Sequence, residues 1–157
     1  GKDVPGYAFL MKSFFTGVTL GFGGHGGVGT PIFYVGATAG SAYGHFIGEA
    51  PALFAAIGFV SLLAGAANTP IAASIMAVEL FGAAVAPYAA ISSVISFAVS
   101  GHRGAYPSQV IAMKKSSSIE VEIGAELLSA QPRYAYREKS FIGLLRYAAG
   151  KARRAKK

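Results

Sequence analysis

The sequence predicts an all-α, multi-pass membrane protein built from tilted and broken helices. Of its 157 residues, 53% are hydrophobic and 13% are charged, and the mean hydropathy is +0.48 although the carboxyl-terminal tail is strongly polar. Between Lys12 and Arg103 the acidic residues are Glu49 and Glu79, and neither lysine nor arginine occurs. A water-soluble domain of this length covers its surface with charge, which this region cannot do.

Apolar segments follow one another through the first 113 residues, which we expect to form the transmembrane part. A helix needs about 20 mostly apolar residues for a full crossing, and several of these segments are shorter. Short segments are typical of tilted or broken helices that line an internal space, whereas a plain bundle would use full-length crossings. The segments are Tyr7–Leu20, Ile32–Gly48, Ala50–Ala67, Ile71–Gly82, Pro87–Ser100 and Tyr106–Met113.

A glycine-rich loop separates the first two segments and reads Gly-Gly-His-Gly-Gly-Val-Gly-Thr-Pro over residues 23–31. Thr30 suits the N-cap and Pro31 the first helical position, so we expect a helix to begin near Ile32. The start of a helix carries unpaired N–H groups and the positive end of its dipole. Inside a membrane, such an end can hold an anion without a basic side chain. The loop therefore indicates an ion path.

Glycines at positions 36, 40, 44 and 48 form one smooth stripe along the second segment. This spacing allows helix backbones to approach closely in lipid, and we interpret it as packing within the chain. Asn68-Thr69-Pro70 repeats the cap-then-proline pattern before the fourth segment, and residues 105–108 offer a third version. One or more of these helix starts would converge on a common site.

Taken in order, these motifs resemble the second half of the membrane domain of the CLC chloride channels and chloride/proton antiporters. The resemblance covers about Tyr7 to Met113, and the motifs together are more specific than each alone. They are the loop Gly-Gly-x-Gly-Gly-Val-x-x-Pro, Val35-Gly36-Ala37 with Gly40, Asn68-Thr69-Pro70 with a Glu79 expected to be buried, and Gly101-His102-Arg103-Gly104-Ala105-Tyr106.

The resemblance implies one half of an inverted-repeat domain that conducts anions, chloride first among them. The loop glycines Gly26 and Gly27 and the helix start at Pro31 would aim the backbone amides of Val28 and Gly29 at the anion, and Tyr106 would donate its hydroxyl. No cofactor is implied beyond the bound anion.

The family also works as a homodimer with one path per subunit. Its contact would use the segments Ile71–Gly82 and Pro87–Ser100, and the last helix, Tyr106–Met113, would lead to the cytoplasm.

This chain departs from the family at the loop and in length. Where the family commonly has Phe and then Ala, this sequence has Gly29 and Thr30, so the path would be wider, Thr30 could add a donor, and the anion could be fluoride or nitrate. The family's other anion loop and its gating glutamate have no counterpart here. We therefore expect the missing amino-terminal half of the same protein to supply them, and channel and antiporter both stay open.

The net charge of +7 comes mostly from basic residues after Met113. This bias predicts that residues 114–157 form a basic tail on the cytoplasmic side, with a contact to anionic lipid or nucleic acid as the alternative. No nucleic-acid-binding module is recognisable, so we expect no such partner. Alternation at Ile119, Val121 and Ile123 favours a short strand.

Several polar residues keep two interpretations each. His25 is either a hydrated loop residue or a pH-sensitive group near the ion. Glu79 is either a hydrogen-bonded structural group or part of a proton path. Tyr106 is either an ion ligand or an anchor at the membrane interface.

Catalysis is not indicated, because no paired carboxylates, Ser-His-Asp set or metal-ligand spacing occurs. Two functions from different classes remain. The first is anion transport, and the second is a small helical membrane scaffold that transports nothing and binds partners through its glycine stripe and basic tail.

Overall fold

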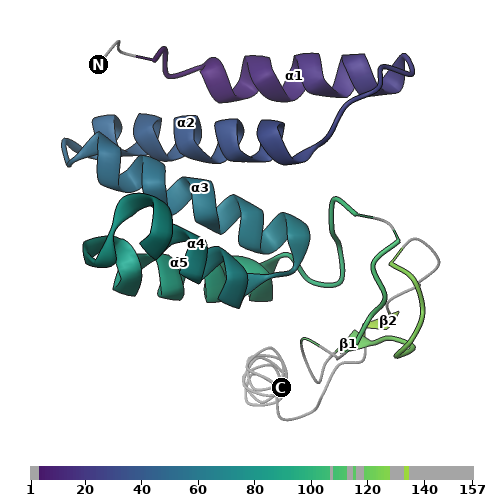
Figure 1. Ribbon diagram of the computed structural model, residues 1–157. Helices are drawn as coiled ribbons and strands as arrows, with labels where there is room; N and C mark the ends of the chain where they lie inside the picture. The colour runs from purple at the N-terminus through teal and green to yellow at the C-terminus, as the bar shows by residue number, and fades with distance from the viewer. Residues whose placement is uncertain (1–3, 107, 113–114, 116–118, 128–132, 135–157) are drawn as a thin grey trace, which may run out of the picture. The chain divides into compact units, whose positions relative to one another are not determined.

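The computed structural model describes residues 4–106, 108–112, 115, 119–127 and 133–134. The chain divides into two compact units, which comprise residues 1–107 and 108–157. Figure 1 shows the helices of the first unit, which are α1 (Ala8–Gly21), α2 (Gly29–Ile47), α3 (Pro51–Ala67), α4 (Pro70–Phe81) and α5 (Ala86–Val99), with a 3₁₀ turn η1 (Ala83–Val85) before α5.

Helix α3 is central in the first unit, since it packs against α2, α4 and α5, while α1 packs against α2. The core at these contacts consists mostly of small residues: Ala56, Val60, Leu63, Ala64, Ala67, Ala73, Ala77, Val85 and Ala89. Small side chains let helix backbones approach closely. Larger apolar side chains such as Phe14, Ile71 and Val99 are exposed instead.

Helices α2 and α3 form the tightest of these contacts, and glycine makes it possible. A Cβ atom at Gly36 would overlap the carbonyl oxygen of Gly58, and one at Gly40 would overlap that of Phe54. At Gly44 it would lie 2.9 Å from the Cα atom of Pro51. The predicted packing within the chain is confirmed at these three glycines. Gly48 differs, because it ends α2 in the left-handed conformation (φ 74°) that glycine adopts without strain.

Helix α2 begins earlier than predicted. Val28 is its N-cap and Gly29 its first residue, so the assignment of Thr30 as N-cap and of a start near Ile32 is wrong. The first helical hydrogen bond runs from the Ile32 N–H to the Val28 carbonyl at 3.1 Å. Pro31 is tolerated in the first turn because N–H groups there have no helical acceptor. The prediction for α4 holds, with Thr69 as N-cap and Pro70 first, although no side-chain capping bond forms.

The helix expected over Tyr106–Met113 is wrong for the described residues 106 and 108–112, none of which is helical. Within the second unit, Ile111 donates its N–H to the carbonyl of Ala125 at 2.9 Å and accepts one from Gly124 at 2.9 Å. So short a segment gains few helical hydrogen bonds, and here its backbone finds acceptors and donors elsewhere. The helix start expected at residues 105–108 is also wrong for the described residues 105, 106 and 108, which are not helical.

The second unit also contains a short antiparallel pair of strands, β1 (Ile119–Glu120) and β2 (Arg133–Tyr134), with Ile119 opposite Tyr134. The predicted strand is therefore confirmed at Ile119 but does not include Val121 or Ile123.

Burial lowers the pKa of the Lys115 ammonium to about 8. Most of the predicted basic tail, including the cluster after Gly150, lies outside the described residues.

Among the helices of the described residues, none combines the length and the apolar character required to cross a bilayer.

The α2–α3 contact yields a stability prediction. Gly40→Ala should lower the free energy of unfolding by about 1–3 kcal/mol, because the new methyl group must push α2 away from the α3 backbone. The matched control is Gly17→Ala in α1, where a Cβ atom meets nothing within 4 Å and alanine favours the helix. Denaturant unfolding of both variants is the measurement. Equal stability of Gly40→Ala and the unchanged protein would contradict the packing argument.

Candidate functional site

The amino end of α2 is the first part of the candidate site. Gly26 and Gly27 are exposed, Val28 and Gly29 are half-buried, and Thr30 is exposed. Because the first N–H groups of a helix lack intrahelical acceptors and Pro31 has no N–H, this end presents the amides of residues 28–30. The first turn contains no acidic residue. The positive end of the dipole of this 19-residue helix is therefore not neutralised by its own side chains.

Tyr106 supplies a hydroxyl group at the same place. A Cβ atom built on Gly29 would lie 3.9 Å from the Tyr106 hydroxyl oxygen. Tyr106 is 38% exposed, so this residue is not part of the buried core. The structure thus brings two sequence-predicted site residues together although 77 positions separate them. The hydroxyl and the amide of Gly29 are both hydrogen-bond donors.

The α2–α3 hairpin explains why these residues meet. Gly36 faces Gly58 and Gly40 faces Phe54, so each step toward the start of α2 is a step toward the end of α3. Continued to Gly29, this register reaches the last turn of α3, near Ala66. The Ala66 carbonyl accepts a hydrogen bond of 2.7 Å from the N–H of Ala105, the residue before Tyr106.

Asn68 makes a second connection to the same segment. Its side-chain amide donates a hydrogen bond of 3.3 Å to the carbonyl of Arg103. Asn68 also ends α3 in the left-handed conformation (φ 58°). In the sequence, Asn68 stood out only as part of a cap-then-proline motif. Its preference for the left-handed region at helix ends was the signal that could have identified it.

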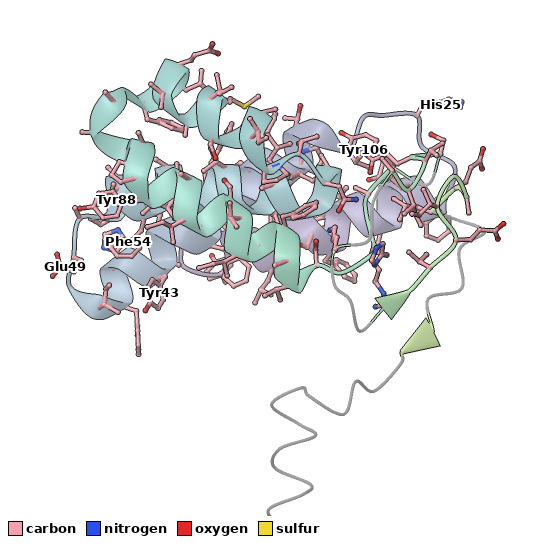
Figure 2. All side chains as sticks on the ribbon, turned by 90° about the horizontal axis from the view of Figure 1, so that it is seen from below. His25, Tyr43, Glu49, Phe54, Tyr88 and Tyr106 are labelled. Atoms are coloured by element: carbon pink, nitrogen blue, oxygen red, sulfur yellow. The ribbon has the colours of Figure 1, made fainter. Side chains whose placement is uncertain are left out.

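His25 lies at the same end of the first unit as Tyr106, whereas Tyr43, Glu49, Phe54 and Tyr88 lie at the other end (Figure 2). His25 is exposed in the loop before α2. No group of three His, Cys, Asp or Glu residues that could hold a metal ion occurs in the described part of the chain.

The expected burial of Glu79 is wrong, because the structure exposes this residue. Helix α4 buries Ala73 and Ala77, which lie on one face at a spacing of four residues. Two further positions turn the chain by about 200°, since a helix has 3.6 residues per turn. Glu79 therefore projects from the opposite face of α4, away from the core.

Comparisons with known proteins agree with the motifs. Residues 3–101 match the profile of the family described as voltage gated chloride channel. The chain is 49% identical over 107 residues to a chloride/fluoride channel protein of Pseudomonas syringae pv. tomato, covering 68% of this chain and 24% of the relative. It is 31% identical over 88 residues to an uncharacterized protein of Methanocaldococcus jannaschii, covering 56% and 22%.

The chain thus spans about a quarter of the length of these curated relatives. No solved structure is significantly similar to it. The family profile covers well over half of the chain, and the resemblance drawn from its motifs is confirmed: the chain belongs to the CLC family of voltage-gated chloride channels.

Proposed function

We propose that the protein carrying this chain transports a small anion, chloride or fluoride, across a membrane, and that α2 and Tyr106 line part of the anion path. Family membership implies a membrane location and supports anion transport. The relative from Pseudomonas syringae is named a chloride/fluoride channel protein. A channel family also agrees with the lack of catalytic residue sets in the sequence. No observation favours the non-transporting scaffold.

The approach of the Tyr106 hydroxyl to Gly29 is the observation that carries this proposal. We assign the anion to the amides of Val28 and Gly29 and to the Tyr106 hydroxyl. These donors are neutral, and the α2 dipole adds about half a positive charge. In a low-dielectric surrounding this attraction is strong enough to replace part of the water shell. Because no full positive charge is involved, the anion can also leave, as conduction requires.

Gly29 and Thr30 bear on which anion is carried. Glycine leaves free the volume that a Cβ atom would occupy beside the Tyr106 hydroxyl. Thr30 is exposed in the first turn of α2, and we propose that its hydroxyl adds a donor. A site with more donors and more water suits a small, strongly hydrated anion such as fluoride. Gly26, Gly27 and Pro31 shape the loop and the helix start.

The assembly proposed for the complete protein is a homodimer with one path per subunit. Exposed apolar side chains along α4 and α5 support a contact with lipid or protein there; they are Ile71, Ile75, Val78, Leu80, Phe81, Tyr88, Ile91, Val94, Ile95 and Val99. We place the basic tail, residues 114–157, on the cytoplasmic side because of its charge. The rest of the protein supplies the second anion loop and any gating glutamate.

Removing the Tyr106 hydroxyl tests the site directly. Tyr106→Phe should weaken chloride and fluoride binding by about two- to tenfold, the loss expected for one hydrogen bond between neutral groups. The measurement is anion efflux from vesicles that contain the complete protein, over a range of anion concentrations. Tyr43→Phe is the control, because Tyr43 lies at the other end of the unit and its ring keeps its contact with Phe54. Unchanged efflux in Tyr106→Phe would contradict the assignment of the Tyr106 hydroxyl to the anion site.

Adding a methyl group at Gly29 tests the size of the site. The Cβ atom of Gly29→Ala would sit 3.9 Å from the Tyr106 hydroxyl and narrow the space beside it. Chloride efflux should fall more than fluoride efflux, because chloride is the larger ion. Gly17→Ala serves as the control for an alanine in an open helical position. An equal loss of chloride efflux and fluoride efflux would show that the methyl group does not change the selection of anions by size.

A further inference from the structure

We infer that Asn68 is a positioning residue that holds the Tyr106 hydroxyl at the start of α2. This inference rests on the proposed function, since it concerns the same anion site. Its basis is a pair of hydrogen bonds, which we call the Asn68 clasp. One runs from the Asn68 side-chain amide to the Arg103 carbonyl at 3.3 Å, and the other from the Ala105 N–H to the Ala66 carbonyl at 2.7 Å.

The hydrogen bond from the Asn68 side chain joins residues much farther apart in the sequence than the hydroxyl bonds of the helices do. Helix hydroxyls such as those of Ser61, Ser74 and Ser92 bond to carbonyls three or four residues earlier in their own helix. The amide of Asn68 instead reaches a carbonyl 35 residues away. It therefore joins the α3–α4 corner to the segment that carries Tyr106.

The segment before Tyr106 depends on such external bonds. Gly101 (φ 60°) and Gly104 give it wide backbone freedom. The buried side chain of His102 fixes its beginning, and the clasp fixes its end. The last clasp bond ends at Ala105, so Tyr106 follows one Cα–Cα step of about 3.8 Å later. Release of the clasp would let the hydroxyl move away from Gly29.

Asn68 has two roles that a substitution can separate. Its backbone ends α3 in the left-handed conformation, and its side chain forms the clasp. Glycine adopts the left-handed conformation without strain. Asn68→Gly therefore keeps the helix end and removes the side-chain bond to the Arg103 carbonyl.

The test is a double-mutant cycle in the complete protein, reconstituted in vesicles and assayed for chloride and fluoride affinity. Asn68→Gly should weaken anion affinity about two- to tenfold when Tyr106 is present, comparable to the loss of one neutral hydrogen bond. In the Tyr106→Phe background the same change should have less than about a twofold effect, because no hydroxyl remains to be positioned. Ser74→Ala, which removes a hydrogen bond within α4, should leave affinity unchanged.

The outcomes separate the two proposals. If Tyr106→Phe weakens binding and Asn68→Gly does not, the clasp inference fails and the proposed function stands. If Asn68→Gly acts equally with and without the Tyr106 hydroxyl, Asn68 has only a general structural role and the inference also fails. If Tyr106→Phe has no effect, the proposed site itself is wrong. Should Asn68→Gly not fold, Asn68→Asp takes its place, since it keeps the size and turn preference but cannot donate to a carbonyl. Its carboxylate also repels anions directly, so the inference then requires its effect to be larger with the Tyr106 hydroxyl than in the Tyr106→Phe background.

Discussion

The close approach of α2 and α3 is the constraint on which the rest of the first unit depends. Glycines at positions 36, 40, 44 and 58 let the two backbones touch, and van der Waals packing of this kind associates helices where lipid removes the hydrophobic drive. The contact fixes the register of the hairpin. It thereby brings the amino end of α2 level with the carboxyl end of α3, and the segment bound to that end carries Tyr106.

The distribution of side-chain size follows the same logic. Alanines such as Ala64, Ala73 and Ala89 fill the core, whereas large apolar side chains such as Phe14 and Ile91 face outward. A water-soluble protein of this size would bury its largest apolar side chains. The reverse arrangement suits a chain whose surroundings are lipid or the remaining parts of a larger protein, in agreement with its family.

The proposed site attracts the anion through oriented neutral donors and a helix dipole rather than through charged side chains. Helix α2 aligns its peptide dipoles toward the loop, and Tyr106 adds a donor from a distant part of the chain. Neutral donors at fixed positions attract an anion without the tight binding that a buried lysine or arginine would produce. Their geometry therefore matters more than their number, which gives a role to Asn68, a residue that we do not assign to the anion itself.

The sequence by itself determined the family and the first five helical segments, because motif order and apolar runs can be read directly from it. It also led us to propose Gly29 and Tyr106 for the anion site. It misplaced the start of α2 by three residues, since proline is tolerated anywhere in a first turn. It also predicted a helix at Tyr106–Met113 where the described backbone forms other hydrogen bonds. Only the tertiary structure decided that Glu79 is exposed and that Asn68 binds the Arg103 carbonyl. Both depend on which helix faces meet, and that is fixed by packing between segments far apart in the chain.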